Sequence, residues 1–310
     1  MAKILVVGAN GFIGSHLVDA LDVLGHQVTA FDRFSSQRPS FDAQSPTIMV
    51  GDFLSRSDLE RAVAGQDYVI HSLSTTTPAT AEGDPTFDIR TNIAQTVELL
   101  ESCVSAGVRH FYFASTGGAI YGSQGKTEYS ESDRALPISP YGIGKLTIEH
   151  YLHYFQVKHG LASTSFRLSN PYGTRQRPNR KQGLIPIALR QIALGRPVMR
   201  LGAGTMVRDY IYVADLVQMV AAVIGNDSRH DLYNIGSGVG LSVNEVIDSL
   251  RRVTGVDFHI DVQPAPPTFV DRVVLNTNRY SAEFGSMPLT PLDEGVRRTF
   301  DEVRSQLDAQ

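Results

Sequence analysis

The chain has 310 residues, of which 42% are hydrophobic and 19% are charged, a composition typical of globular proteins. Its length allows one large domain or two closely joined domains. The formal net charge of −4, without any block of like charge, argues against a nucleic-acid-binding protein. The densest basic stretch, Arg175 to Lys181, is interrupted by Pro178 and Asn179, which favours a solvated or substrate-phosphate loop.

Cys103 is the one cysteine of the chain, and it lies in a helical pattern. It excludes an intrachain disulfide framework and indicates a small buried hydrophobe rather than a nucleophile. The scattered histidines lack metal-ligand spacing, so we expect no metal. No run approaches the roughly 20 apolar residues that span a bilayer, and the first apolar run, Ile4 to Val7, is too short for the core of a secretory signal, so we expect a cytoplasmic protein.

Short apolar runs alternate with amphipathic segments in the first half of the chain. The runs predict strands at 4–7, 27–31, 47–50, 68–71, 111–114 and 163–167. The segments between them predict helices at about 13–24, 57–63, 88–106 and 140–158. This alternation favours an α/β fold, a doubly wound parallel sheet (Rossmann) with helices on both faces.

The pattern changes after Asn170. Loops become longer and richer in Pro, Arg and Gly, and we expect helices to be the main element. A segment from about 208 to 236 is predicted to return to the sheet. We therefore expect a first domain of residues 1–170 plus about 208–238. A smaller C-terminal region would contain about 171–207 plus 239–310.

A glycine-rich turn joins the first predicted strand to the first predicted helix. Gly8, Gly11 and Gly14 take the first, fourth and seventh positions of Gly8-Ala9-Asn10-Gly11-Phe12-Ile13-Gly14. Glycine adopts positive φ and lets the backbone approach a pyrophosphate, whose charge the helix N-terminus attracts. The turn is therefore typical of a dinucleotide site.

The residues after the second predicted strand bear on which dinucleotide would bind. A carboxylate at Asp32 accepts hydrogen bonds from ribose hydroxyls and repels a 2′-phosphate, which favours NAD over NADP. Arg33 could instead hold that phosphate, so NADP stays an alternative.

Tyr141 and Lys145 stand four residues apart on one face of a predicted helix. A phenol with a pKa near 10 is a poor base at neutral pH. A nearby ammonium and the positive nicotinamide ring would lower that pKa, so Tyr141 could exchange a proton with a substrate hydroxyl. Lys145 could also hold the nicotinamide ribose. Downstream of a dinucleotide turn, this spacing favours catalysis.

With these motifs the sequence resembles the extended short-chain dehydrogenase/reductase superfamily, and within it the NAD-dependent epimerase/dehydratase family of nucleotide-sugar enzymes. The resemblance covers nearly the whole chain. The other segments that carry it are Gly51-Asp52-Phe53, Asn92, Tyr121-Gly122, the run from Arg167 to Gly173, the run from Val207 to Asp215, and the run from Tyr233 to Gly236.

The resemblance implies a third catalytic residue, a Ser or Thr after the fifth strand that hydrogen-bonds the reacting hydroxyl. Aligning the strand puts Thr116 there, with Ser115 as its neighbour and fallback. Counting backwards from Tyr121 would instead select Gly117. The resemblance also assigns Asn170 and Arg208 to the diphosphate of the substrate.

The resemblance thus gives a full set of expected site residues. The catalytic residues are Thr116, Tyr141 and Lys145. The residues expected to bind NAD are Gly8, Gly11, Phe12, Ile13, Gly14, Asp32, Arg33, Asp52, Phe53, Leu73, Ser74, Asn92, Tyr141 and Lys145. The residues expected to bind a nucleotide-diphosphate sugar are Ser115, Thr116, Tyr141, Asn170 and Arg208.

The chain departs from the family pattern at two places. Many relatives have an Ala-Ala pair after the fourth strand, where this chain has a hydroxyl-rich run from Ser72 to Thr77. Relatives often carry an Arg three residues before the acid corresponding to Asp271, where this chain has Thr268. Arg272 could substitute, and the nucleotide base stays open. His71, at the end of the fourth strand, is expected to be a structural histidine.

The resemblance implies a nucleotide-sugar 4-epimerase. Tyr141 would take the proton of the 4-hydroxyl while NAD accepts the C4 hydride, and the 4-keto sugar would turn and take the hydride back on its other face. An NAD(P)H-dependent 4-keto-sugar reductase needs the same three residues and stays an alternative. A catalytically silent dinucleotide-sensing module is the alternative outside enzymes, although such relatives typically lose the Tyr or the Lys.

Two further expectations follow from the resemblance. A 4,6-dehydratase is disfavoured, because Gly117-Gly118 stands where such enzymes have an Asp-Glu pair. A homodimer is expected, because the helices at about 88–106 and 140–158 correspond to those that form a four-helix bundle in the family.

Overall fold

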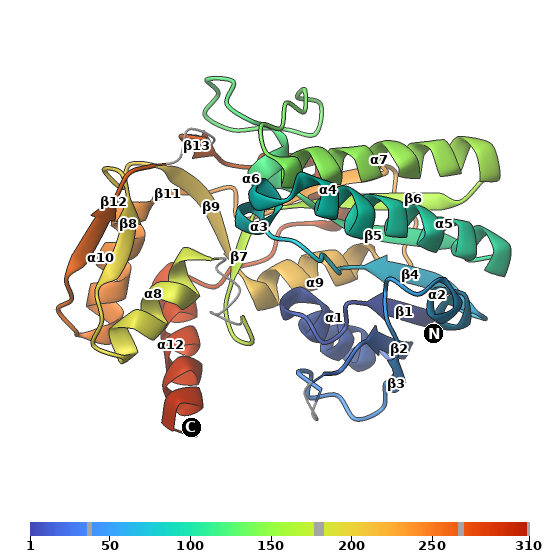
Figure 1. Ribbon diagram of the computed structural model, residues 1–310, viewed down its shortest axis with the longest axis horizontal. Helices are drawn as coiled ribbons and strands as arrows, with labels where there is room; N and C mark the ends of the chain where they lie inside the picture. The colour runs from blue at the N-terminus through green and yellow to red at the C-terminus, as the bar shows by residue number, and fades with distance from the viewer. Residues whose placement is uncertain (36–38, 177–182, 266–269, 309–310) are drawn as a thin grey trace. The chain divides into compact units, whose positions relative to one another are not determined.

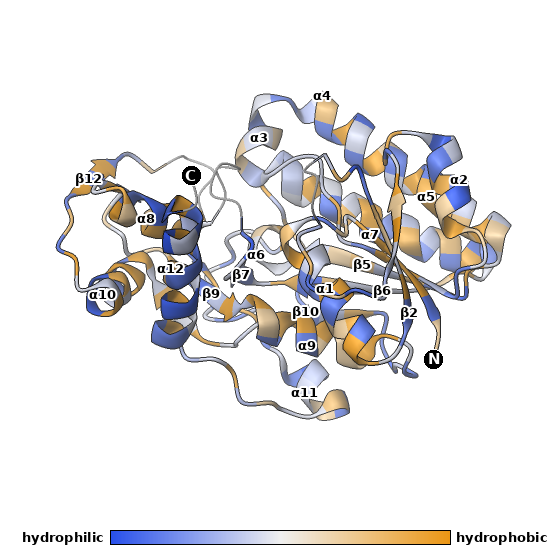
Figure 2. Ribbon diagram, turned by 90° about the horizontal axis from the view of Figure 1, so that it is seen from below, coloured by the Kyte–Doolittle hydropathy of each residue, from blue (hydrophilic) through white to orange (hydrophobic). Residues whose placement is uncertain are grey.

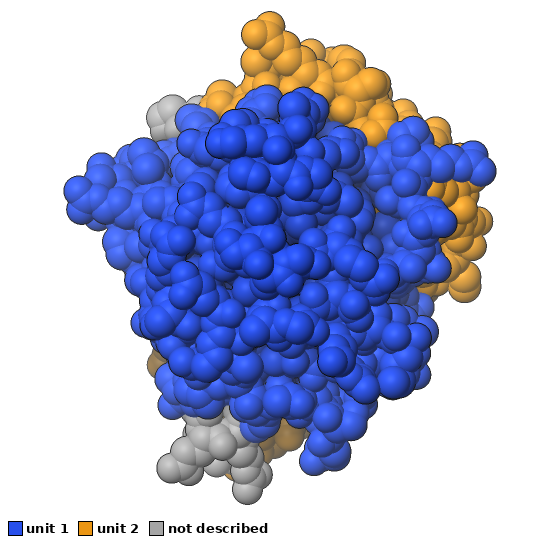
Figure 3. Space-filling view, turned by 90° about the vertical axis from the view of Figure 1, so that its right-hand side faces the viewer, with its two compact units in different colours: residues 1–116, 139–167, 217–233 blue, residues 117–138, 168–216, 234–310 orange. Residues whose placement is uncertain are grey.

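The computed structural model describes residues 1–35, 39–176, 183–265 and 270–308. The chain forms two compact units, coloured separately in Figure 3. The first contains residues 1–116, 139–167 and 217–233, and the second contains residues 117–138, 168–216 and 234–310. Thr268 and most of the basic stretch from Arg175 to Lys181 lie outside the described residues.

These units differ in their bounds from the two regions expected from the sequence. Residues 117–138 and 208–216 belong to the second unit, whereas we expected them in the first domain. The expected division concerns which ligand each region binds, and it stays a prediction.

A seven-stranded parallel sheet forms the centre of the first unit (Figure 1). Its order is β3-β2-β1-β4-β5-β6-β10. The strands are β1 (Lys3–Val7), β2 (Gln27–Asp32), β3 (Thr47–Val50), β4 (Tyr68–His71), β5 (His110–Thr116), β6 (Ala162–Leu168) and β10 (Leu232–Ile235). The order reverses between β1 and β4, and in open α/β sheets ligands bind outside the carboxyl ends of the strands at such a point.

Helices cover both faces of this sheet, which confirms the doubly wound fold. Helix α1 (Phe12–Val23) packs against β1 and β2, while α2 (Arg56–Val63), α5 (Gln95–Ala106) and α7 (Pro140–His159) pack side by side. Leu5 and Val7 join the core beneath α2, α5 and α7, and alternation along the strand turns Ile4 and Val6 to the opposite face. The hydrophobic colour of the sheet strands in Figure 2 follows from this burial on both faces.

The helix expected at 88–106 begins earlier and is not α-helical throughout. Helix α4 (Pro85–Asp88) leads into the π-helix η1 (Ile89–Ala94), and α5 follows. Helix α3 (Pro78–Gly83) precedes them and was not expected; the side chains of Thr77 and Asp84 cap α3 and α4. A π-helical turn often stands at a functional site, and here its buried residues are Thr91 and Asn92.

Helices supply most of the regular structure in the described part of the second unit, as expected, and two small sheets accompany them. Strands β7 (Asn170–Tyr172), β9 (Val207–Tyr212), β11 (Gly240–Ser242) and β13 (Arg272–Val273) form one sheet, and β8 (Val198–Leu201) pairs with β12 (Ile260–Gln263). The helices are α6 (Gly117–Ile120), α8 (Leu184–Ala193), α10 (Val243–Thr254), α11 (Asn278–Phe284) and α12 (Leu292–Asp308). Helix α9 (Val213–Val223) begins in the second unit, and from Val217 onward its residues belong to the first. Of the segment at 208–236, β10 joins the large sheet as expected, whereas β9 does not.

Apolar side chains of α8, α10 and α12 form the core of this second unit. Helix α10 begins with a capping box between Ser242 and Glu245 and ends at Gly255 in the left-handed conformation, and both features can be recognised in the sequence as helix ends.

In the first unit Cys103 is buried in the core, where burial raises the pKa of its thiol. None of the helices in the described ranges has the length and apolar composition needed to cross a bilayer.

Candidate active site

The turn after β1 can be built only with glycine at two of its positions. Gly8 has φ +87°, and a Cβ at Gly14 would lie 2.0 Å from the Gly8 carbonyl oxygen. Gly11 is the N-cap of α1, and no side chain caps this helix. The helix therefore starts with N–H groups that no side chain satisfies, which suits an anion. Phe12 and Ile13 are its first residues.

Asp32 ends β2 beside this turn, and the backbone fixes its carboxylate. Oδ2 accepts a hydrogen bond from the N–H of Asn10 at 3.0 Å, and Oδ1 accepts one from the N–H of Arg33 at 2.7 Å. Asn10 in turn accepts a hydrogen bond from the N–H of Ser40 at 2.7 Å. Arg33 is exposed. The orientation of Asp32 is thus set by the turn itself.

Asp52 and Phe53 follow β3, and their side chains have different surroundings. A Cβ at Gly51 would lie 2.4 Å from the Phe31 ring, which explains the glycine. Asp52 accepts a hydrogen bond from the N–H of Leu54 at 3.0 Å. The Phe53 ring is buried and stacks on His71, with 5.1 Å between the ring centroids. Any contact between Phe53 and adenine would therefore come from its backbone.

The loop after β4 lies against the glycine turn. A Cβ at Gly8 would lie 2.8 Å from the backbone nitrogen of Leu73. The Ser72 hydroxyl donates to the carbonyl of Val7 at 2.9 Å, and the Ser74 hydroxyl donates to the carbonyl of Thr76 at 2.8 Å. Leu73 therefore lies against the glycine turn, whereas the Ser74 hydroxyl is bonded within its own loop; their contact with a cofactor stays a prediction.

The hydroxyls that replace the Ala-Ala pair of many relatives connect this loop to the helices that follow it. The N–H of Thr75 donates to Asn92 Oδ1 at 2.9 Å, and Asn92 Nδ2 donates to the Thr76 hydroxyl at 2.9 Å. Thr75 and Thr91 share a hydrogen bond of 2.6 Å between their hydroxyls. Asn92 is thus occupied in holding the loop.

Helix α7 carries Tyr141 and Lys145 on one face. Ser139 caps the helix by accepting from the N–H of Gly142 at 3.2 Å, and Pro140 takes the first helical position. Lys145, 7% exposed, donates from Nζ to the carbonyl of Ala114 at 2.8 Å. Its Nζ also lies 5.8 Å from the centroid of the Tyr141 ring. The ammonium therefore stands between the end of β5 and the phenol.

The ionisation of this pair in the protein alone is governed first by burial. Burial, followed by the negative charge of Asp88, raises the pKa of Tyr141 to about 12. The predicted lowering of that pKa depends on the nicotinamide ring of bound NAD as well as on the ammonium, so it stays a prediction. Burial lowers the pKa of Lys145 to about 8, and the charges of Asp88 and Glu149 oppose that shift.

Ser115 and Thr116, adjacent at the end of β5, have different partners. The Ser115 hydroxyl donates to Glu149 Oε1 at 2.5 Å, and Glu149 forms a buried ion pair with Arg167 at 2.7 Å. Thr116 is 8% exposed, and no hydrogen bond joins its hydroxyl to any residue in the described ranges. Thr116 is therefore the one of the two whose hydroxyl is available to a substrate.

In the second unit, Asn170 and Arg208 come from neighbouring strands of one small sheet. Asn170 of β7 pairs in parallel with Tyr210 of β9, and Arg208 stands two residues before Tyr210. Because side chains alternate along a strand, Asn170 and Arg208 share a face of this sheet. The Asn170 amide donates to the carbonyl of Asp209 at 3.3 Å, and Arg208 donates to the carbonyl of Val207 at 2.8 Å.

Other residues of the family segments hold the second unit together. Asp209, 1% exposed, accepts hydrogen bonds from the N–H and the hydroxyl of Ser237 and from the N–H groups of Gly238 and Leu275. Asn234 accepts from the Tyr121 hydroxyl at 2.7 Å. These residues serve the fold.

Gly117 and Gly118 are explained by what lies beside them in the second unit. A Cβ at Gly117 would lie 2.5 Å from the Leu275 side chain, and one at Gly118 would lie 3.4 Å from the Asn170 amide. The position expected to hold the first acid of a dehydratase is therefore filled by Leu275.

Two acids near Tyr141 and Lys145 were not predicted from the sequence: Asp88 in α4, and Glu149 in α7 itself. Asp88 lies one helical turn before Asn92, and Glu149 lies one turn after Lys145. That spacing was visible, but Asp88 stood where the helix was expected to begin, a common place for an acid. No group of three or more His, Cys, Asp or Glu side chains within the described ranges could hold a metal ion.

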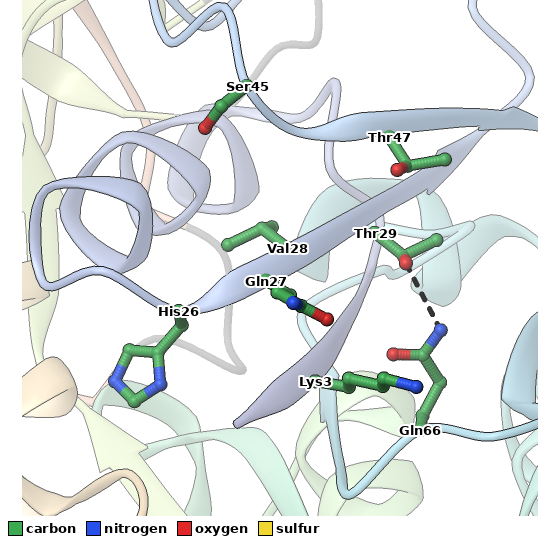
Figure 4. A pocket seen from close by; sticks show the side chains of 8 residues that line it. All are labelled: Lys3, His26, Gln27, Val28, Thr29, Ser45, Thr47 and Gln66. Atoms are coloured by element: carbon green, nitrogen blue, oxygen red, sulfur yellow. Dashed lines mark hydrogen bonds between the residues drawn. The ribbon is translucent and has the colours of Figure 1, made fainter. Parts of the chain in front are cut away.

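A cavity of about 260 Å³ lies at the amino ends of the strands of the large sheet (Figure 4). It is lined by residues at the amino ends of β1, β2 and β3 and by nearby loop residues. Gln66 donates there to the Thr29 hydroxyl at 3.1 Å. Because ligands of such sheets bind at the carboxyl ends, this cavity is separate from the candidate active site.

Comparison with known proteins agrees with this geometry. The model of the NAD dependent epimerase/dehydratase family matches residues 4–236. The chain is also similar to the dTDP-4-dehydro-6-deoxyglucose reductase of Escherichia coli, with 29% identity over 97% of each protein.

Two solved structures are similar over almost the whole chain. The UDP-glucose 4-epimerase of Thermotoga maritima with UDP-glucose gives a TM-score of 0.92 at 34% identity, covering 98% of this chain and 99% of that one. The UDP-glucose 4-epimerase of Thermus thermophilus in complex with NAD gives a TM-score of 0.90 at 31% identity, covering 97% and 99%.

Proposed function

Because this chain belongs to the NAD-dependent epimerase/dehydratase family, we propose that it is a nucleotide-sugar 4-epimerase. The observation that carries the proposal is the position of the Lys145 ammonium, held by the Ala114 carbonyl next to Thr116 and close to the Tyr141 ring. Two UDP-glucose 4-epimerases with very similar folds support UDP-hexoses as the substrate class.

The first unit fits NAD. The turn has no room for a Cβ at Gly8 or Gly14, and Asp32 presents a carboxylate fixed by the backbone. Both features suit a dinucleotide without a 2′-phosphate. When bound, NAD would supply the acceptor and later the donor of the C4 hydride, together with a positive charge beside the phenol.

The residues of this chain would manage the proton and the orientation of the sugar. Thr116 would hydrogen-bond the 4-hydroxyl, and Tyr141 would take its proton and later return it. Lys145 would stabilise the phenolate, which the buried phenol needs because its own pKa is raised to about 12. Asn170 and Arg208 would hold the substrate diphosphate through an amide and a guanidinium.

The reaction has no net redox change, because the hydride removed from C4 returns to C4. A 4-keto-sugar reductase is the alternative, favoured by the similarity to the E. coli reductase. It would use the same Thr, Tyr and Lys but would consume NADH or NADPH. Interconversion of UDP-glucose and UDP-galactose without loss of cofactor absorbance supports the epimerase. Stoichiometric loss of that absorbance with a 4-keto-6-deoxy sugar supports the reductase.

Replacement of Tyr141 by Phe tests the mechanism. We expect turnover of UDP-galactose to fall by roughly 10²- to 10⁴-fold, since the group that transfers the proton is removed. Tyr151→Phe is the matched control, because it removes a phenol hydroxyl from the same helix; its turnover should match that of the wild type. Unchanged turnover in Tyr141→Phe would contradict the proposed mechanism.

A homodimer is also part of the proposal. Helix α7 exposes Ile143, Tyr154 and Val157 along one side, and η1 exposes Ile89. Val157 is 74% exposed, and apolar side chains gathered on neighbouring helices mark interaction surfaces. A second copy of the chain would cover them by helix pairing. Light scattering should give twice the monomer mass, and a monomer mass would contradict this part of the proposal.

A further inference from the structure

We propose that Asp88 is a positioning residue of the active site, whose carboxylate is held against α7 and sets the pH range in which Tyr141 can transfer its proton while Lys145 stays charged. This inference rests on the proposed function for its consequence in catalysis. Its central claim concerns ionisation, which can be measured without any turnover.

The carboxylate of Asp88 is anchored on the side away from α7. Asp88 ends helix α4 and is 3% exposed. Its Oδ1 accepts hydrogen bonds from the Thr76 hydroxyl and from Asn92 Nδ2, the second at 2.9 Å. Asn92 is itself fixed, because its Oδ1 accepts from the N–H of Thr75 at 2.9 Å. The loop after β4 and the π-helix together fix the direction of the carboxylate.

The other oxygen of Asp88 lies against the catalytic helix. A Cβ at Gly144 would lie 2.6 Å from Asp88 Oδ2, so a glycine is required at this position of α7. Gly144 directly precedes Lys145 and follows Tyr141 by three residues, and residues three or four apart share a helix face. The negative charge therefore sits beside the face that carries both Tyr141 and Lys145.

A negative charge at this place affects both groups in the same direction. It disfavours the phenolate of Tyr141 and favours the ammonium of Lys145, so it raises the pKa of each. For Lys145 this opposes burial, which acts to remove the proton. Asp88 thus helps to keep Lys145 charged near neutral pH, so that the ammonium can stabilise the phenolate when the proton moves.

Other charged groups face the pair as well. Glu149 of α7 is balanced by Arg167 of β6 at 2.7 Å. His71 of β4 is buried, which lowers its pKa to about 3 and leaves it neutral. The remaining titratable groups on elements packed against α7 are Glu82 in α3, Arg90 in η1, Glu98, Glu101 and Cys103 in α5, and His110 and Tyr112 in β5. Glu82, Arg90 and Glu101 are exposed. Asp88 is thus the buried acid facing the pair that no cation balances among the described ion pairs.

Asp88→Asn tests the inference by removing the charge while keeping the size of the side chain. The chain has no tryptophan and 12 tyrosines, so tyrosinate formation can be followed by ultraviolet absorbance. The contribution of Tyr141 is the difference between each protein and the same protein carrying Tyr141→Phe. We expect Tyr141 to ionise about one to three pH units lower in Asp88→Asn.

Asp84→Asn is the matched control, because Asp84 is the exposed N-cap of the same helix α4 and the substitution removes the same charge. It should leave the titration of Tyr141 unchanged. A shift of equal size in Asp84→Asn would overturn the inference, because any nearby charge would then have the effect.

Gly144→Ala gives a second route if Asp88→Asn does not fold. The added methyl group must displace the carboxylate from α7 while its charge remains, so the ionisation of Tyr141 should move in the same direction by a smaller amount. An unchanged Tyr141 titration in the folded variants would overturn the inference, whatever their activity.

Turnover gives the consequence in catalysis. With an active epimerase, the whole pH profile of kcat should move to lower pH in Asp88→Asn, because both pKa values fall. A uniform loss of kcat without that movement would mean a merely structural role and would overturn the inference. A lowered Tyr141 pKa in a protein without epimerase activity would support the role of Asp88 while contradicting the proposed function.

Discussion

Asp88 in the first unit and Asp209 in the second are both buried acids, and their hydrogen bonds give them different roles. Asp209 accepts from backbone and hydroxyl donors at both of its oxygens, so its charge is used to hold the loops at 237–238 and 275. Among the described residues, Asp88 accepts hydrogen bonds at Oδ1 alone, and its Oδ2 faces helix α7. The surroundings of each carboxylate oxygen therefore decide whether a buried acid holds the fold together or shifts the ionisation of its neighbours.

Tyrosines of the family segments show the same difference. The Tyr121 hydroxyl donates to the Asn234 amide within the second unit. The Tyr141 hydroxyl has no hydrogen bond to any residue in the part of the chain that the structure describes. One phenol is used in the fold, and the other is left for a ligand.

Asp209→Ala should have the largest effect on stability. The substitution leaves four hydrogen-bond donors without their acceptor: the N–H and hydroxyl of Ser237 and the N–H groups of Gly238 and Leu275. We expect a loss of roughly 3 kcal/mol or more in the free energy of unfolding. Urea unfolding measures this loss. Asp301→Ala, at an exposed position of α12, is the control and should stay within about 0.5 kcal/mol of the wild type.

Asp88→Asn should lose clearly less stability than Asp209→Ala, because asparagine can still accept from Thr76 and Asn92. Equal losses of stability in these two variants would show that Asp88 supports the fold as much as Asp209 does, which would contradict its separate role.

His71→Gln tests how a second buried ionisable side chain of the first unit affects stability. Burial, and then the charge of Lys145, lower the pKa of His71 to about 3. The unfolded chain therefore takes up a proton below about pH 6.5 that the folded protein resists, so stability falls as the pH falls from about 6.5 towards 3. His71 alone should account for about 2 kcal/mol between pH 6.5 and 5.

Gln can keep a hydrogen bond to Thr96 but does not titrate, so the acid dependence of the unfolding free energy should be smaller in His71→Gln. His150→Gln, at an exposed position of α7, serves as the control. The same pH dependence in His71→Gln and the wild type would show that His71 contributes nothing to it.

The fold of the first unit follows closely from local patterns in the sequence. Buried strands of four to seven residues, such as Tyr68–His71 and His110–Thr116, are apolar runs that periodicity detects. The small sheet of the second unit was missed because its strands are short and depend on one another. For example, the two-residue strand Arg272–Val273 has no strand pattern in the sequence, and it is defined by the pairing of Val273 with Arg208.

The residues of the candidate site also differ in whether local sequence spacing or a distant partner determines their role. The glycine turn, Asp32, Tyr141 and Lys145 are spaced along the chain as the fold requires, so the sequence predicts them. The choice between Ser115 and Thr116 depends on Glu149, which lies 34 residues away from Ser115. The role of Asp88 depends on Gly144 of another helix, which no local pattern reveals.

The packing of Gly117 against Leu275 also constrains how this protein could evolve. An acid at 117 is the change that a dehydrating relative would need first, yet its Cβ would meet the Leu275 side chain at 2.5 Å. A smaller residue at 275 would have to arise beforehand, and by itself it would leave a cavity costing about 2 kcal/mol or more. A smaller residue at 275 followed by an acid at 117 is therefore better tolerated than the reverse order. The contact between Gly117 and Leu275 thus makes it harder for this chain to acquire the acid expected of a dehydratase.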